Sequence, residues 1–487
     1  MNRSPVNLVA MLLLCAFSFG ASLTRQALAQ TTKVAIHATQ EEVNIWKQRA
    51  LSGPYLNDWS RILNRANSFR SNPSGKWLGN QQNQAWDGDL VRDCARLPTV
   101  YPGGNSGDCA GNGARTFADG IRDAGFVYLL TGDTSYRNAV LTLLLGQTAE
   151  FGTDFTNATR WPLNYVNKDK DFQISLWLRK MTYAYSYIRG SISQSDRNTI
   201  DAWFLKAAQW LDVVVHNASK TRFPNRYQDD YSNPASAGSS LGLTHASGYQ
   251  TYWFGYAWDN KASQHNAAVA AIGALLNDTT LLSHSKRFVK EFLKYNVYAD
   301  GTVWDQRRWS ESTAQSGWAY AATVIGSNIT AADHIARTGD TELYTYSTTE
   351  GAHGSQGGPK NLLRVMHRLA NLTLGNSYAY ASSDGTLSSA DRIDPDGESP
   401  NPVRHYIYDV SLAQANVFYR DNLLKSSYTR PMVADPSNGG YDPWGGDWGN
   451  LPGALFMFGQ MEGIASPYSG ASSSTLTAPA NLSITSY

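Results

Sequence analysis

The chain has 487 residues, of which 42% are hydrophobic and only 17% are charged. This composition supports a large folded core and excludes an intrinsically disordered protein. With 41 Lys and Arg residues against 40 Asp and Glu residues, the net charge excludes a protein that binds nucleic acid through its overall charge.

Residues 1–29 predict a signal peptide. A basic start at Arg3 precedes an apolar run from Leu8 to Phe17, and Ala27-Leu28-Ala29 has the small-x-small pattern of a cleavage site. The apolar run is too short to cross a bilayer comfortably. We therefore expect an exported chain, periplasmic or secreted, that begins near Gln30 and does not bind a membrane.

Two cysteines, Cys94 and Cys109, remain after this cleavage. In an exported protein they predict one disulfide, because the compartment is oxidising. The bond would close the Gly- and Asn-rich segment Tyr101–Asn112 and contribute about 3 kcal/mol.

Helical spacing of apolar residues dominates the chain from Phe117 onward. The predicted helices are Phe117–Leu130, Thr134–Phe151, Phe172–Ile188, Ser195–Val215, Gln264–Leu276, Thr279–Tyr298, Trp309–Ile325, Ala331–Arg337, Pro359–Leu374 and Tyr408–Asp421. The turn Thr131-Gly132-Asp133-Thr134 recurs as Thr338-Gly339-Asp340-Thr341. Sequential helices joined by short turns predict an all-α fold of paired helices, arranged in a ring or a stack.

One predicted helix is apolar on every side. Ala267–Leu276 contains no polar face, so other elements must cover it all round. The next helix, Leu282–Tyr295, is amphipathic. An apolar helix followed by an amphipathic one predicts a buried inner helix that is covered by an outer helix.

Long insertions rich in Gly, Asn, Ser and Tyr interrupt the helices at Lys220–Lys261, Tyr344–Gly358 and Ser377–Arg404. We expect one domain over residues 30–464. Residues 465–487 are rich in Ser, Thr, Ala and Pro and predict a loose tail.

The residues that suggest chemistry gather near two helices. Gln264, His265 and Asn266 open the apolar helix, with Ser263 as the expected N-cap. They either cap the helix and bind nearby loops, or they bind a ligand. Tyr320 lies on a later predicted helix.

A basic pair, Arg307 and Arg308, precedes that later helix and lies beside Trp304. Such a pair either holds a carboxylate against an aromatic platform or faces bulk solvent. Four further ring-bearing residues lie in the insertion before the apolar helix, and they form either a sugar-stacking wall or a loop packed onto the helices: His245, Tyr249, Tyr252 and Trp253.

This order of elements, from Arg115 to Ile325, resembles the alginate-lyase-like polysaccharide lyases. The shared order is a polar turn with His, an apolar helix, an amphipathic helix, an Asp-Gly turn, a basic pair and a helix with Tyr. The segment Phe117–Tyr136 is also similar to their early helical hairpin. Those lyases show Asn-His where this chain has Gln264-His265, and a shorter spacing than that from Arg308 to Tyr320.

The resemblance implies an incomplete (α/α)6 or (α/α)7 toroid with long loop insertions. It also implies β-elimination on a 1,4-linked polyuronate, with alginate, particularly mannuronate-rich alginate, ahead of glucuronan. The C5 proton leaves and the bond to the 4-oxygen breaks, once the neighbouring carboxylate has been neutralised. Amides of Gln264 or Asn266 and a guanidinium of Arg307 or Arg308 would neutralise it. His265 and Tyr320 would be base and acid, with Tyr320 expected to protonate the leaving oxygen.

Two other classes of protein remain open on the same helical body. A glycoside hydrolase would use paired carboxylates, for which Asp229-Asp230 and Asp442 with Asp447 are candidates. A glycan-binding protein would have the aromatic cleft without catalysis. The His pattern lacks the spacing of a zinc site, so we expect no metal and no cofactor. The expected partner is an acidic polysaccharide, with no nucleic acid, and the expected state is a monomer.

Overall fold

The structure is a computed structural model, and it describes most of the helical body of the chain. The described residues are 32–71, 73, 106–151, 168–222, 258–298, 301–303, 305, 314–349, 359–374, 380–381, 387–388, 409–429, 451–452, 454–461 and 463–468. α-Helices dominate them, and each sheet in this part has only two strands. The predicted all-α class is therefore confirmed. Within these residues, no helix is long and apolar enough to span a bilayer.

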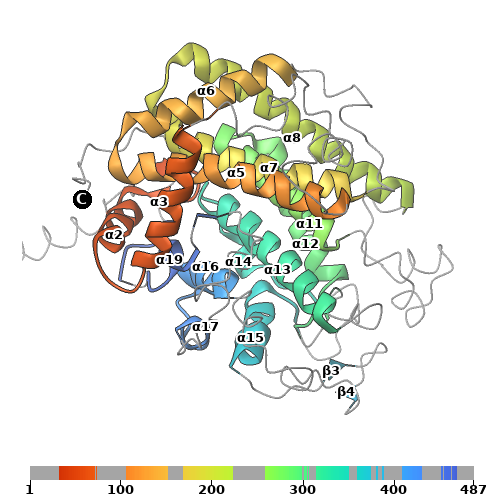
Figure 1. Cartoon of the computed structure of the whole chain (residues 1–487). Helices are drawn as coiled ribbons and strands as arrows, with labels where there is room; N and C mark the ends of the chain where they lie inside the picture. Colours follow the sequence, from red (N-terminus) through yellow and green to blue (C-terminus); the bar gives the residue numbers. More distant parts are fainter. Residues whose placement is uncertain are drawn as a thin grey trace, which may run out of the picture.

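Five helices follow one another through the molecule, and we call them the row helices (Figure 1). They are α5 (Ser106–Thr131), α7 (Lys168–Ile188), α11 (Asn260–Leu276), α13 (Ala314–Ala336) and α16 (Asp409–Tyr419). Each row helix packs against the next in this order. The row thus brings side by side segments that lie far apart in the sequence.

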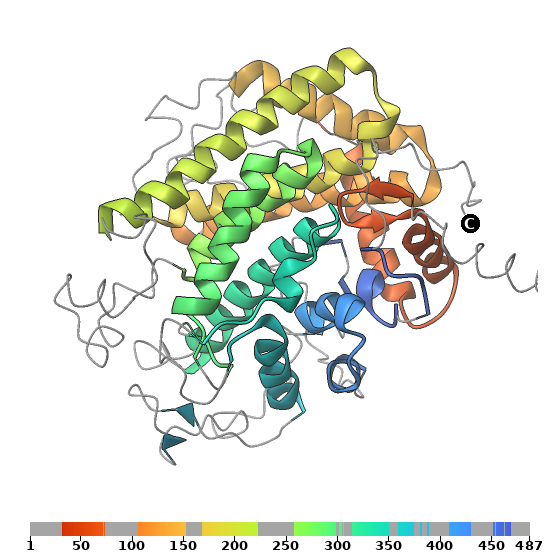
Figure 2. The same ribbon diagram turned by 180° about the vertical axis from the view of Figure 1, so that it is seen from behind.

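Three covering helices pack against the row (Figure 2). They are α6 (Thr134–Phe151), α8 (Gln194–Arg222) and α12 (Thr279–Tyr295). α6 contacts both α5 and α7, α12 contacts both α11 and α13, and α8 contacts α11. As predicted, α11 is buried all round as far as Leu275, whereas α12 buries Phe288 and Phe292 and exposes Arg287.

Each row helix is preceded by a long connection and followed by a short one. The long connections are 72–105, 152–167, 223–259, 296–313 and 374–408, and the short ones are 132–133, 189–193, 277–278, 337–341 and 420–421. The short connection after α7 includes the 3-10 turn η4 (Arg189–Ser191). α5 and α7 run in the same direction, because Gly125 faces Ala184 while Asp119 meets Lys180. Their long connections therefore enter at the same end of the row.

The remaining elements lie before α5 and after α13, and contacts of α2, α3 and α19 link the two ends of the row. The N-terminal ones are β1 (Lys33–Ala35), β2 (Ala38–Thr39), α2 (Gln40–Leu51) and α3 (Leu56–Ser71), and the later ones are α14 (Glu342–Thr345), α15 (Leu362–Thr373), β3 (Tyr380–Ala381), β4 (Leu387–Ser388), α17 (Asn422–Tyr428) and α19 (Ala454–Phe458). α2 and α3 pack on α5, and α19 contacts both α16 and α2. The last row helix is thereby linked back to the first.

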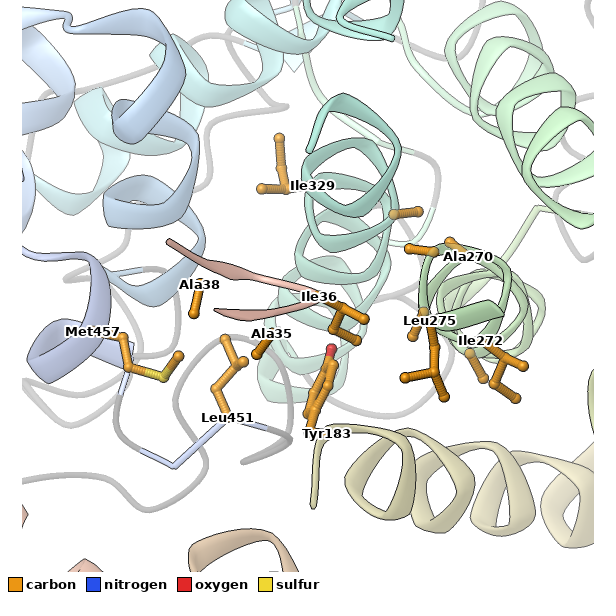
Figure 3. Close-up of a cluster of buried hydrophobic side chains, with 14 of the residues drawn as sticks. Ala35, Ile36, Ala38, Tyr183, Ala270, Ile272, Leu275, Ile329, Leu451 and Met457 are labelled. Atoms are coloured by element: carbon orange, nitrogen blue, oxygen red, sulfur yellow. The ribbon is translucent and has the colours of Figure 1, made fainter. Parts of the chain in front are cut away.

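The β1–β2 hairpin is inserted among the row helices. Figure 3 shows Ile36 of its turn beside Tyr183 of α7, with Ala270 of α11 nearby. Its neighbour His37 is fully buried. A capping box joins the hairpin to α2, since Thr39 Oγ1 accepts from the Glu42 amide and the Glu42 carboxylate accepts from the Thr39 amide.

Several boundaries differ from the sequence-based expectations. Ser263 is not the N-cap of α11, because the helix starts earlier and Asp259 accepts from the Ala262 amide at 2.9 Å. The two helices expected between Trp309 and Arg337 form the single helix α13, since no residue between them breaks the helix. The segment expected to be a disulfide-closed loop becomes helical from Ser106 onward.

Two residues near the start of the segment expected to be loose, Pro467 and Tyr468, are buried, whereas Ala465 and Ser466 before them are exposed. Tyr468 is 6% exposed, and its hydroxyl donates to Asp333 Oδ1 at 2.6 Å. The prediction for residues 469–487 falls outside the described part of the chain.

Candidate functional site

The polar residues that open α11 reach in different directions. Gln264 Oε1 accepts a hydrogen bond from Nη1 of Arg179 on α7. Ser263 Oγ accepts from Asn328 Nδ2 of α13 at 3.0 Å. Asn266 Nδ2 approaches the backbone oxygen of Ser285 on α12 at 3.4 Å. Gln264 and Ser263 therefore face the two neighbouring row helices, whereas Asn266 faces a covering helix.

These contacts fix the orientation of His265. Successive residues of an α-helix lie about 100° apart around its axis. His265 thus lies about 200° from Ser263 and about 100° from Gln264, on the side of α11 turned away from α13 and α7. α8 packs on this helix as well, and the His265 ring is fully buried.

The polar contacts continue from α11 through α7 to α5. Lys180, directly after Arg179, places its Nζ 2.7 Å from Asp119 Oδ1. Arg122 Nη1 lies 2.9 Å from the same oxygen, and Arg122 Nη2 lies 2.8 Å from Asp123 Oδ1. These residues join four row helices at one level, and we call them the polar belt: Asp119, Arg122, Asp123, Arg179, Lys180, Ser263, Gln264 and Asn328.

Among the described side chains of the polar belt, cations outnumber carboxylates. It contains three cations and two carboxylates, and Arg65 of α3 adds a fourth cation through its ion pair with Asp123. Arg122, Arg179 and Lys180 are all at most 2% exposed. Burial alone would raise the pKa of Asp119, but Lys180 and Arg122 beside it hold that pKa below its usual value.

A second buried cluster lies around the hairpin. His37 Nε2 is 2.7 Å from the Tyr187 hydroxyl, and His334 Nε2 is 3.1 Å from the Tyr183 hydroxyl. The two imidazole centroids are 6.1 Å apart. Burial lowers the pKa of both rings well below the usual value, and Arg337 and Lys33 lower them further. Both rings are therefore neutral at pH 7.

Arg337 holds the hairpin end of α2 against α13. Its Nη1 and Nη2 lie 2.8 and 2.9 Å from the two carboxylate oxygens of Glu42, and its Nε lies 2.9 Å from Asp333 Oδ2. All three side chains are at most 2% exposed. This bidentate pair fixes the hairpin in place.

The structure places the remaining predicted site residues only in part. Tyr320 lies on α13, and at 1.5 Å per residue its backbone is about 12 Å before Asn328 along the axis. Cys109 lies within α5. The others fall outside the described residues: Cys94, His245, Tyr249, Tyr252, Trp253, Trp304, Arg307, Arg308, Asp229, Asp230, Asp442 and Asp447. Of these, nine belong to the long connections that enter α11 and α13: Asp229, Asp230, His245, Tyr249, Tyr252, Trp253, Trp304, Arg307 and Arg308.

Sequence reasoning missed the polar belt of α5 and α7. Its signal was present, because Arg179-Lys180 interrupts an apolar stretch and Asp119, Arg122 and Asp123 share a helical face at i, i+3 and i+4. Charged residues in a helix that is otherwise spaced for burial must find partners inside the protein.

No protein-family model matches the chain, and no curated protein matches it significantly. Among the described residues, no group of three or more His, Cys, Asp or Glu side chains is arranged to hold a metal ion.

Proposed function

We propose that the chain is an exported polysaccharide lyase that cleaves a 1,4-linked polyuronate by β-elimination without a metal. Alginate, above all poly-mannuronate, and glucuronan are the proposed polymers. In this proposal the row and covering helices are parts of an incomplete (α/α) toroid. The observation that carries the proposal is the buried, cation-rich polar belt, because a uronate polymer presents one carboxylate per sugar.

Two features of the architecture support this proposal. The row helices alternate with covering helices, and α19 links α16 back to α2. Each row helix also receives a long connection at its N-terminal end. Binding residues commonly lie on such loops around a rigid body.

The proposed roles follow from the contacts of the belt. Arg179 and Gln264 bind the sugar carboxylate and stabilise the charge that develops when C5 loses its proton. Tyr320 of α13 is the proposed acid that protonates the leaving oxygen. His265 is the proposed base, although its position on α11 is turned away from α7 and α13. The variant His265→Asn, described below, distinguishes a catalytic role of the ring from a structural one.

The polar belt favours elimination over hydrolysis. A glycoside hydrolase needs a carboxylic acid whose pKa is raised, so that it can protonate the leaving oxygen. The partly exposed carboxylate of the belt, Asp119, has a lowered pKa because Lys180 and Arg122 lie beside it. It is therefore poorly suited to that role.

The test uses the purified chain without residues 1–29 on poly-mannuronate, poly-guluronate and glucuronan, each with and without EDTA. Ultraviolet absorbance of the unsaturated uronate and the number of new reducing ends are followed together. We expect absorbance to rise on at least one polymer, with or without EDTA. New reducing ends without absorbance would indicate hydrolysis, and the absence of both would contradict the proposal.

Variants then test the roles of individual residues. Gln264→Ala removes an amide from the carboxylate site and should lower kcat by about 100-fold or more. Gln194→Ala on the exposed start of α8 is the matched control. His265→Asn should leave unfolding unchanged and abolish turnover if the ring is the base. If the ring only packs beneath α8, the variant lowers the unfolding temperature and keeps turnover per folded molecule.

A further inference from the structure

Asp119 is the partly exposed carboxylate of the polar belt. Its side chain is 25% exposed, whereas Lys180 and Arg122, which hold it, are 1% and 2% exposed. Both cations approach the same oxygen, Oδ1, which is itself buried. The exposure therefore falls on the rest of the side chain, including the edge of the carboxylate turned away from its two cations.

The packing of α5 shows which side of the helix this edge occupies. A Cβ at Gly125 would meet the Ala184 backbone of α7 at 2.9 Å, and one at Gly120 would meet Phe69 of α3 at the same distance. At 100° per residue, Asp119 lies about 120° from the first contact and about 100° from the second. The wider sector between the two contacts contains Asp119 and also Phe126, which packs on Trp46 of α2 and Phe456 of α19. The narrower sector, about 140° wide, is left for the covering helix α6. Asp119 is therefore on the side of α5 opposite α6.

The two neighbouring cations of α7 divide the polar belt into two halves. Arg179 reaches Gln264 on α11, whereas Lys180 reaches Asp119 on α5. The belt thus ends at α5 in an ionised carboxylate that is partly exposed. An ionised carboxylate only accepts hydrogen bonds, and it repels a second anion.

We propose that Asp119 is a specificity-determining residue that accepts a hydrogen bond from a free hydroxyl of the bound polyuronate, and that it rejects polymers in which this hydroxyl carries an acetyl or sulfate group. The inference rests on the proposed function. An ester at this position removes the donor, so the exposed edge of the Asp119 carboxylate loses its water without gaining a hydrogen bond in exchange. A sulfate adds like-charge repulsion.

The experiment compares kcat/KM on poly-mannuronate with kcat/KM on the same polymer after chemical O-acetylation. If the natural chain prefers glucuronan, the matched glucuronan pair is used instead. A hydrogen bond to a charged group corresponds to roughly a 10- to 100-fold preference for the free polymer. Asp119→Asn should lower kcat/KM on the free polymer, mainly through KM, and leave the acetylated polymer unchanged. The preference ratio then falls toward one, and Asp119→Glu restores part of it.

Asp119→Asn leaves Lys180 with a weaker partner, so unfolding temperatures are measured for every variant. The double variant Asp119→Asn, Lys180→Met removes the buried cation as well and keeps the test valid if the single variant is unstable. Asp133→Asn, on the exposed turn after α5, is the control and should keep the preference of the natural chain. An unchanged preference ratio in both Asp119 variants overturns the inference. If the natural chain cleaves no polyuronate, the proposed function fails and this inference fails with it.

Discussion

Arg337→Met tests how strongly the hairpin end is fixed to α13. The change removes one guanidinium and leaves the Glu42 and Asp333 carboxylates buried without their shared cation. Breaking a buried ion pair by deleting one partner costs about 3–5 kcal/mol. Asp333 keeps the hydroxyl of Tyr468 at 2.6 Å, whereas Glu42 keeps only the donors of Thr39. We therefore expect a loss of about 3–5 kcal/mol, most of it from Glu42.

Urea unfolding, followed by circular dichroism and tryptophan fluorescence, measures this loss as a shift of the midpoint at constant slope. The matched control is Arg70→Met, since Arg70 forms an exposed pair with Asp133 at 3.3 Å and should cost about 0–1 kcal/mol. The double variant Arg337→Met, Glu42→Met removes one stranded carboxylate and should recover part of the loss. If Arg337→Met costs no more than Arg70→Met, the described network does not hold the hairpin and the reasoning is refuted.

Two further predictions concern pH and packing. The folded chain keeps His37 and His334 neutral, with pKa values below the unfolded value of 6.5. The two neutral rings therefore contribute fully to the free energy of unfolding above pH 6.5. This contribution is lost as the pH falls from 6.5 through the pKa values of the folded chain, at about 1.4 kcal/mol per pH unit for each ring. Unfolding temperatures measured between pH 7.5 and 5 should fall more steeply for the natural chain than for His37→Gln, and equal slopes would contradict the assignment. Gly125→Ala places a Cβ 2.9 Å from the Ala184 backbone oxygen and should cost about 1–3 kcal/mol in urea unfolding. Gly463→Ala meets nothing within 4 Å and should be neutral, so equal stabilities of the two variants would show that α5 and α7 are less closely packed than described.

The helices and their turns were predictable because their signals are local. The recurring Thr-Gly-Asp-Thr turn ends one helix and starts another in both places. Gly132 and Gly339 have φ of 74° and 104°, which glycine adopts without strain. Asp133 and Asp340 then accept from amides in the first turn of the following helix. Each step depends on residues a few positions apart.

The orientation of α11 was not predictable from its sequence. Because the helix is apolar on every side after its first turns, no amphipathic pattern shows which side faces α7 and α13. Gln264 and His265 are adjacent in the sequence, and only the contacts of Gln264 with Arg179 separate their surroundings. Which of the two side chains faces α7 is decided by Arg179, a partner 85 residues away in the sequence.

The N-terminal hairpin and α2 were also missed. The hairpin strands are only three and two residues long, which is too short for an alternating pattern to stand out. The capping box of Thr39 and Glu42 was readable as a helix start. Its second role was not, because Glu42 meets Arg337 295 residues later in the chain.

The link between the two ends of the row also has a consequence for how the chain folds. The Trp46 indole nitrogen donates to the Met457 backbone oxygen at 2.7 Å across 411 residues, so the first described helix is completed by one of the last. A chain that emerges from a ribosome N-terminus first must hold α2 and the hairpin without their final partners until Met457 has appeared. Contacts of such long sequence separation slow folding, and the exposed apolar surface meanwhile favours aggregation. We therefore expect the native state to form only after α19 has emerged, because α2 packs against it.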